Sequence, residues 1–259
     1  MPIAEVNATR LHYEIDGPED APVLLMSNSL GTDLRMGDGQ MPAFTQFFRI
    51  LRYDSRGHGR SGVPEGPYSI EMLGEDALGL LDTVGVERAH FCGLSKGGMV
   101  GQWLATHAPA RIDRLVLANT SAHLPPRELW DERIGTVLAG GMKAVADSVV
   151  ERWFTADFRA ARPEEAAEVK EMILATPAAG YAASCAAVRD MDLRENASAI
   201  SALTFIVVGV HDPATPPSHG EFLQHAIHGS RLARLQAAHL SNVEAAPAFN
   251  QAVLTFLTN

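Results

Sequence analysis

The sequence predicts an α/β fold, in which a mostly parallel central sheet carries helices on both faces and an inserted helical lid. Its 259 residues are 46% hydrophobic, enough for a large core, and one α/β unit commonly reaches about 250 residues. Short apolar runs alternate with stretches of helical period, the pattern of a parallel sheet covered by helices. This alternation stops once, over an alanine-rich helical stretch. We therefore expect a discontinuous α/β core, residues 1–121 and 191–259, and a helical lid at residues 122–190.

In the first part of the core we expect a hairpin at residues 6–15, followed by buried strands at 23–27 and 49–54. Each of these two strands runs directly into a loop that contains glycine, asparagine or aspartate. Open α/β sheets carry their functional sites on such loops, at the carboxyl ends of the strands. These loops are therefore the first places to look for site residues.

A helix is predicted next, because apolar residues repeat at helical spacing along one side of residues 70–84. Ser69 precedes this helix as a predicted N-cap, and Gly85 ends it. The chain then continues with a strand at 89–92, a helix at 95–107 and a strand at 114–119. This order is typical of consecutive βαβ units.

The second half of the chain begins with the lid, for which helices are predicted at residues 144–153 and 163–175. Afterwards the alternation of strands and helices resumes. We expect a strand at 203–208, a helix at 218–227, a strand at 231–236 and a closing amphipathic helix at 242–257.

The charge balance excludes some classes of partner. Lysine and arginine number 21 against 31 acidic residues, a net charge of −10, and no basic run is present. We therefore expect no nucleic acid partner. No apolar run approaches the ~18 residues of a membrane span, and the first residues lack a signal pattern, so we expect a cytoplasmic protein without membrane contact. Cys92 and Cys185 are expected to be buried thiols.

The pattern G-x-S-x-G occurs at residues 93–97, between a predicted strand and a predicted helix. A nucleophile elbow needs this pattern, because its strained turn leaves no room for side chains two residues before and after the serine. The turn would hold the Ser95 hydroxyl at a helix N-terminus, where developing negative charge is favoured. A chance glycine-rich turn is the alternative, and the strand–turn–helix context favours Ser95 as a nucleophile.

A serine nucleophile needs a base and an acid that orients the base, and in this arrangement they follow in the order serine, acid, histidine. Asp212 follows the predicted strand at 203–208, and His239 lies in the loop before the closing helix. Both occupy places that this order requires, although Asp-Pro is also a turn signal. The other candidates fit less well: Asp82 within a helix, Asp190 and Asp192 at the lid junction, and His211 directly beside the acid.

Attack on a carbonyl also requires N–H donors for the oxyanion. One donor is expected from the backbone of Lys96, the residue that follows the nucleophile. The second is expected from the loop after the strand at 23–27, and we choose the N–H of Leu30. Ser27 and Ser29 either brace this loop or bond only to solvent.

Motifs for metals and nucleotides are weak. Neither H-E-x-x-H nor paired C-x-x-C occurs, so no metal site is expected. The pattern G-x-G-x-x-G at residues 57–62 follows a strand, but a dinucleotide fingerprint must then open a helix. Pro64 and Pro67 cannot continue one. We therefore interpret these glycines as shaping a loop beside the site and expect no cofactor.

With these residues identified, the chain resembles the α/β-hydrolases and, within them, the 3-oxoadipate enol-lactonases of aromatic catabolism. The resemblance covers nearly the whole chain and is carried by S-N-S-L-G-T-D at 27–33, R-Y-D-S-R-G-H-G at 52–59, F-C-G-L-S at 91–95 and R-W-F-T at 152–155. It implies cofactor-free hydrolysis of an enol-lactone to 3-oxoadipate. Residue by residue, it implies Ser95 as nucleophile, His239 as base, Asp212 as acid, and Leu30 and Lys96 as oxyanion donors.

Two places depart from this family. Lys96 stands where methionine or glutamine is usual, and Gly37 and Gly39 stand where tryptophan and proline are common. We expect the glycines to enlarge the pocket and loosen its loop. The Lys96 side chain could bind a carboxylate, lower its own pKa by desolvation, act as an amine nucleophile, or be an ordinary solvated lysine. Such departures would suit an engineered or functionally diverged member.

The lactone carries a carboxylate, which a chain of net charge −10 must bind with a local cation. Arg133 and Arg152 of the lid are the candidates besides Lys96, and Trp130 and Trp153 either line the lid or serve as core. We expect acyl transfer on a small-molecule lactone or ester. The alternatives are an esterase or carbon–carbon bond hydrolase on the same triad, and a non-catalytic binding protein of the same fold.

Overall fold

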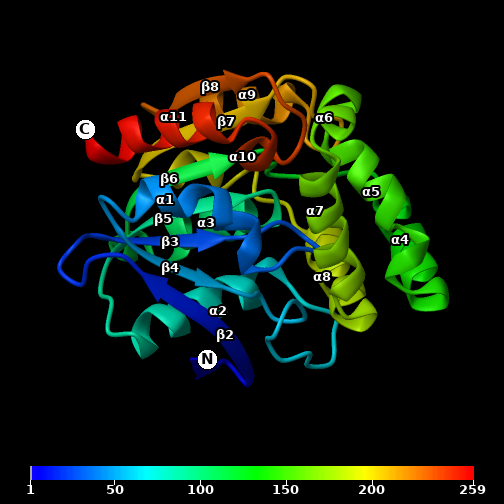
Figure 1. Cartoon of the computed structure of the whole chain (residues 1–259). Helices are drawn as coiled ribbons and strands as arrows, with labels where there is room; N and C mark the ends of the chain where they lie inside the picture. The colour runs from blue at the N-terminus through cyan, green and yellow to red at the C-terminus, as the bar shows by residue number, and fades with distance from the viewer. Residues whose placement is uncertain (1) are drawn as a thin grey trace.

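The computed structural model describes residues 2–259 and contains one eight-stranded sheet in the order β1-β2-β4-β3-β5-β6-β7-β8 (Figure 1). The strands β1 and β2 form an antiparallel hairpin, and β2 is also antiparallel to β4. All other neighbouring strands are parallel. The strands are Ile3–Val6, Thr9–Asp16, Val23–Ser27, Arg49–Tyr53, Ala89–Leu94, Ile112–Ala118, Leu203–Gly209 and Arg231–Leu235 for β1 to β8. The predicted α/β class with a mostly parallel sheet is confirmed.

Side chains alternate between the two faces of this sheet, as the strand period of two requires. On β3, Leu25 packs into one apolar cluster, whereas Leu24 and Met26 pack into the other. The first cluster is covered by α2, α3 and α9, and the second by α1 and α11. These helices are Ile70–Thr83, Lys96–His107, Pro217–Ala226, Met41–Phe44 and Ala246–Thr258, respectively. The core therefore lies on both faces of the sheet, with helices on each.

The chain between β6 and β7 is almost entirely helical. It contains α4 (Arg127–Gly140), α5 (Ala146–Trp153), α6 (Ala156–Ala161), α7 (Pro163–Ala175) and α8 (Ala178–Asp190), with a short 3₁₀ helix at Met142–Ala144. Figure 1 shows these helices beyond the arrowheads of β3 and β6, at the carboxyl ends of the strands. We call residues 122–190 the lid segment. Within residues 2–259, no helix is both long enough and apolar enough to cross a membrane.

Some predicted elements differ from the structure. The predicted N-terminal hairpin is present, but it begins at Ile3 and not at Val6, and it turns at Asn7 and Ala8, both of which have positive φ. The closing helix is divided into α10 (Ser241–Glu244) and α11, because Pro247 lacks the N–H that a continuous helix needs. The sequence also gave no prediction of several short helices: 3₁₀ helices at Leu34–Gln40, Pro109–Arg111 and Ala197–Ala199, and the helices α1 and α6.

Candidate active site

Ser95 lies in the sharp turn between β5 and α3, with φ 57° and ψ −116°. This backbone conformation is strained for a residue with a side chain. The turn also brings backbones so close that a Cβ on Gly93 would lie 2.2 Å from the Gly97 carbonyl oxygen, and one on Gly97 2.1 Å from that of Ser27. Thr120 Oγ1 holds the turn by donating to the Ser95 carbonyl at 2.7 Å. A Cβ at position 93 or 97 would collide with backbone, so both positions require glycine, and the turn has the tight geometry that a nucleophile elbow needs.

His239 and Asp212 form a buried pair, in which His239 Nδ1 and Asp212 Oδ2 are 2.8 Å apart. The Asp212 carboxylate also accepts from Asn119 Nδ2 at 3.0 Å, from Thr215 Oγ1 at 2.7 Å, and from the backbone N–H groups of Ala214 and Thr215. Burial alone would raise the pKa of Asp212, but His239 and these donors outweigh it and hold the pKa at about 2. Asp212 therefore stays ionised and orients the imidazole.

A pocket of about 310 Å³ joins Ser95 and His239. Leu30 forms part of its wall, and the lid segment contributes four residues predicted to bind substrate. These four are Trp130, Arg133, Arg152 and Trp153. The Trp153 ring also lies beside the His239 ring, tilted by 34° and with 5.9 Å between centroids. The structure thus brings the predicted nucleophile, base and lid residues to one cavity, with Asp212 behind the histidine.

The loop that contains Leu30 is held on several sides. Gly97 N donates to the Asn28 carbonyl at 3.1 Å, and Gly31 N donates to His58 Nε2 at 3.0 Å. The Leu30 N–H has no acceptor within residues 2–259, and the Lys96 N–H is at the first position of α3, where a helix offers none. Both N–H groups therefore remain available to an oxyanion.

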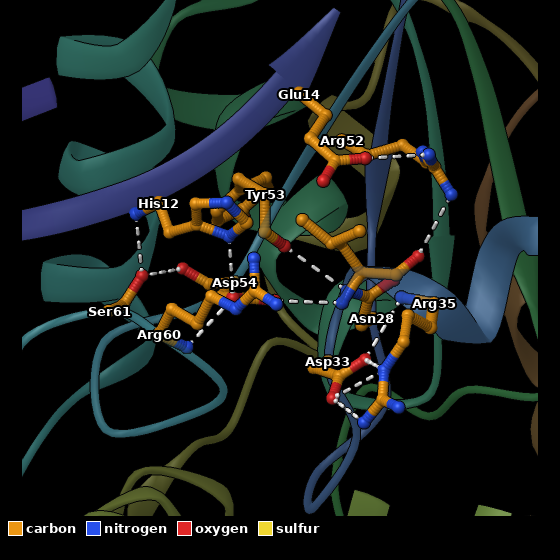
Figure 2. A network of polar contacts seen from close by, with 11 residues as sticks. His12, Glu14, Asn28, Asp33, Arg35, Arg52, Tyr53, Asp54, Arg60 and Ser61 are labelled. Atoms are coloured by element: carbon orange, nitrogen blue, oxygen red, sulfur yellow. Dashed lines mark hydrogen bonds and ion pairs between the residues drawn. The ribbon is translucent and has the colours of Figure 1, made fainter. Parts of the chain in front are cut away.

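Asp54, which follows β4, anchors the far end of the same loop. Its carboxylate accepts from the Leu34 N–H at 2.8 Å, from His12 Nδ1 at 2.9 Å and from the Arg60 N–H at 2.9 Å. Figure 2 shows Asp54 between His12 and the loop that carries Asn28 and Asp33. Sequence reasoning missed Asp54 and His58 as site residues. Both residues lie in the loop that follows the parallel strand β4, a position at which functional residues are common. The glycine pattern of this loop does not indicate their contacts.

Comparison with known proteins identifies the family of this chain. A family model described as alpha/beta hydrolase fold matches residues 22–246. This chain belongs to the α/β hydrolases. 3-oxoadipate enol-lactonase 2 of Acinetobacter baylyi is 40% identical over 244 residues, which cover 94% of this chain and 91% of that protein.

Solved structures give the same result. The crystal structure of the enol-lactonase from Burkholderia xenovorans LB400 matches with a TM-score of 0.98 and 46% identity, over 100% of both chains. A hydrolase from Pseudomonas aeruginosa matches with a TM-score of 0.97 and 49% identity, over 100% of this chain and 98% of that one.

In this α/β hydrolase, the Lys96 side chain does not face the pocket. It is 1% exposed, and its Nζ has no hydrogen-bond partner within the described chain. The expectation of a solvated lysine is therefore wrong. Binding of a carboxylate and action as an amine nucleophile are wrong as well, because both require contact with the substrate. Burial lowers the pKa of the Lys96 ammonium to about 7, against smaller opposing effects of Cys185 and Asp76. Desolvation is the alternative that the structure supports.

Gly37 and Gly39 do not enlarge the pocket, so that expectation was wrong. Both belong to the 3₁₀ helix at Leu34–Gln40, away from the pocket wall. A Cβ on Gly37 would lie 3.1 Å from Met26 Cε, and one on Gly39 would lie 4.0 Å from Ala246 Cβ. Gly37 faces β3 and Gly39 faces α11, so both glycines belong to the packing of the 3₁₀ helix. Their closeness in sequence to the Leu30 loop does not place them at the pocket.

Arg133 and Arg152 supply positive charge to the pocket. Within residues 2–259 neither makes a salt bridge with a carboxylate, and the Arg133 guanidinium lies over the Trp130 ring at 5.0 Å. Burial and, next, the nearby Arg133 lower the pKa of Arg152. Two cations in one pocket with no acidic partner are suited to an anionic ligand.

Proposed function

We propose that this chain is a serine hydrolase that opens 3-oxoadipate enol-lactone through an acyl-enzyme. The observation that carries the proposal is that one pocket holds Ser95 and His239 together with two arginines that lack carboxylate partners. The first pair suits an electrophilic carbonyl, and the second suits the carboxylate of the lactone. The relatives named enol-lactonases support this choice of substrate over a neutral ester.

In the acylation step, His239 takes the proton of the Ser95 hydroxyl as its oxygen attacks the lactone carbonyl. Asp212 stabilises the imidazolium that forms. The N–H groups of Leu30 and Lys96 receive the oxyanion of the tetrahedral intermediate. When the intermediate collapses, the ring carbon–oxygen bond breaks, and the electron pair leaves with the oxygen as an enolate.

The enolate takes up on carbon the proton that His239 removed from Ser95 and becomes a ketone, which leaves the imidazole neutral again while the acyl group stays on Ser95. His239 then removes a proton from water, whose oxygen attacks the ester carbonyl, and returns that proton to the Ser95 oxygen as it leaves. The product is the open dicarboxylate. An enolate is a better leaving group than an alkoxide, so ring opening needs little acid assistance.

We further propose that residues 122–190 act as a lid over this chemistry. Its helices contribute both arginines and both tryptophans of the pocket wall, so that substrate contacts come from the lid and reacting groups from the core. Trp130 and Trp153 would pack against the lactone ring, and Arg133 and Arg152 would hold its carboxylate.

The decisive experiment combines hydrolysis of the enol-lactone with labelling by a fluorophosphonate probe. Ser95→Ala should lose both, because it removes the proposed nucleophile. Ser29→Ala is the matched control: this serine also lines the pocket, but its hydroxyl has no hydrogen-bond partner in the described chain. It should keep labelling. Absence of labelling in the folded protein would favour a non-catalytic binder, and a panel of neutral esters and carbon–carbon substrates would expose an esterase or carbon–carbon bond hydrolase.

A further inference from the structure

Glu244, the last residue of α10, connects the histidine loop to the lid segment. Its Oε2 accepts from the Ala238 N–H at 2.8 Å. Its Oε1 accepts from the Thr155 N–H at 3.2 Å and from Thr155 Oγ1. Glu244 makes no salt bridge within residues 2–259, so its carboxylate is bound by these donors, which come from the histidine loop and the lid segment. Hydrogen bonds to an ionised acceptor are stronger than neutral ones.

The two segments held by Glu244 both reach the pocket. Ala238 directly precedes His239, and Thr155 lies two residues after Trp153. Two further contacts join the same segments: Leu240 N donates to the Trp153 carbonyl at 3.2 Å, and the rings of Trp153 and His239 are in contact. The base and one wall of the pocket are thus connected by a carboxylate, a backbone hydrogen bond and a ring contact.

Thr155 has a second structural role that strengthens this connection. It is the N-cap of α6, because its Oγ1 accepts from the Phe158 N–H at 3.2 Å while its hydroxyl donates to Glu244. The junction between α5 and α6 is therefore fixed at its start. Movement of this part of the lid segment would break hydrogen bonds to a part-buried carboxylate, or would carry the histidine loop with it.

We propose that Glu244 is a positioning residue, which couples Trp153 of the lid segment to the catalytic histidine so that the substrate wall and the base keep one relative placement. This proposal rests on the function proposed above, in which His239 acts as the base. Glu244 touches neither substrate nor the reacting atoms. It acts through Ala238 and Thr155, and its loss should lower turnover more than substrate binding.

The test measures kcat and KM for the enol-lactone in Glu244→Ala, Glu244→Gln, Thr155→Val and Thr155→Ser, each corrected for the folded fraction by circular dichroism. In Glu244→Ala we expect kcat to fall between about tenfold and a hundredfold, the effect of misplacing a catalytic group by ~1 Å. KM should change several-fold less than kcat. Glu221→Gln is the matched control, because this exposed glutamate binds Arg234 away from the pocket and should leave both constants unchanged.

The threonine variants test the coupling itself. Thr155→Val removes the hydroxyl and should lower kcat, whereas Thr155→Ser restores the donor and should return to the wild-type value. Adding Thr155→Val to Glu244→Ala should cost less than the sum of the two single effects, because the shared interaction is already lost and only the cap of α6 is lost in addition. If Glu244→Ala does not fold, Glu244→Gln and Thr155→Val carry the same test.

The outcomes separate this proposal from the proposed function. Unchanged kcat per folded molecule in the Glu244 variants, with Ser95→Ala inactive, would overturn the coupling alone. Full additivity of the Glu244 and Thr155 effects would overturn it as well. A Ser95→Ala variant that still hydrolysed the lactone would overturn the proposed function and, with it, this inference.

Discussion

His58 Nε2 accepts the hydrogen bond of the Gly31 N–H at 3.0 Å, one residue after the predicted oxyanion donor Leu30. Because Nε2 is the acceptor, the proton of a neutral ring is on Nδ1, which lies 3.1 Å from the Arg56 carbonyl oxygen. Burial and then the nearby Lys96 hold the pKa of His58 well below its usual value. The ring therefore stays neutral and keeps its acceptor available to the oxyanion loop.

Replacing His58 should therefore impair turnover without touching the triad. In His58→Ala the buried Gly31 N–H loses its acceptor, which we expect to cost about 1–3 kcal/mol of unfolding free energy. The loop that carries Leu30 should also loosen, and we expect kcat to fall roughly tenfold to a hundredfold. Urea unfolding and steady-state kinetics measure the two effects. His228→Ala, at an exposed histidine, is the control, and an unchanged kcat in His58→Ala would refute the positioning role.

Lys96→Met should stabilise the protein at neutral pH. The pKa of Lys96 falls from its ordinary 10.5 to about 7 on folding. Below pH 7 the folded state must hold a buried ammonium, so the penalty is complete there. Between pH 7 and about 10.5 the unfolded chain binds the proton and the folded chain does not, so wild-type stability rises with pH. The cost at neutral pH is on the order of 4 kcal/mol.

The measurement is the unfolding free energy of both proteins between pH 6 and 10. Methionine removes the titrating group, so the difference between the variant and the wild type should be largest at the acidic end and shrink as pH rises. A difference that does not depend on pH would contradict the lowered pKa. The titratable groups that interact electrostatically with Lys96 are His58, Cys185 and Asp76, and none of them forms a salt bridge with it. Lys96→Arg, which cannot lose its charge, should be less stable than the wild type above pH 7, where the wild-type lysine is neutral, and the difference should grow as pH rises.

Gly37→Trp should destabilise the protein and leave substrate binding unchanged. A Cβ at this position would already lie 3.1 Å from Met26 Cε and 3.5 Å from Arg52 Cδ, so an indole must displace the buried packing between the 3₁₀ helix and β3. We expect a loss of about 1–3 kcal/mol, as for other overpacked cores. The thermal midpoint and KM test this directly. A changed KM with no loss of stability would mean that position 37 does affect the substrate pocket.

Local patterns predicted where in the fold the candidate site residues lie. The tight turn at Ser95 was predictable because G-x-S-x-G between a strand and a helix allows few backbone paths, and the proximity of Asp212 and His239 because the ends of parallel strands meet at one sheet edge. The directions of long side chains were not predictable. Lys96 follows the nucleophile in sequence, yet its amine lies in the interior because α3 turns its side chain away from the pocket.

Contacts between distant segments were equally beyond the sequence. Nothing in the sequence around Glu244 indicates its contact with Thr155, which the lid segment brings to it. In the same way, Asp54 binds Leu34 and His12 only in the folded sheet. No spacing along the chain encodes these contacts. They depend on how the helices between β6 and β7 return over the carboxyl ends of the strands.

The arginines of the pocket give the most direct test of substrate class. Arg133→Ala and Arg152→Ala should each raise KM for the enol-lactone about tenfold to a hundredfold, because a hydrogen bond to a charged group contributes roughly 1.5–3 kcal/mol. For a neutral enol-lactone of the same ring, which has no carboxylate, the change in KM should be much smaller. Arg127→Ala is the matched control, since this lid arginine pairs with Asp190 outside the pocket. Equal effects on the charged and the neutral lactone would mean that the arginines shape the wall and do not bind the carboxylate, because only a charge-specific contact can discriminate between the two substrates.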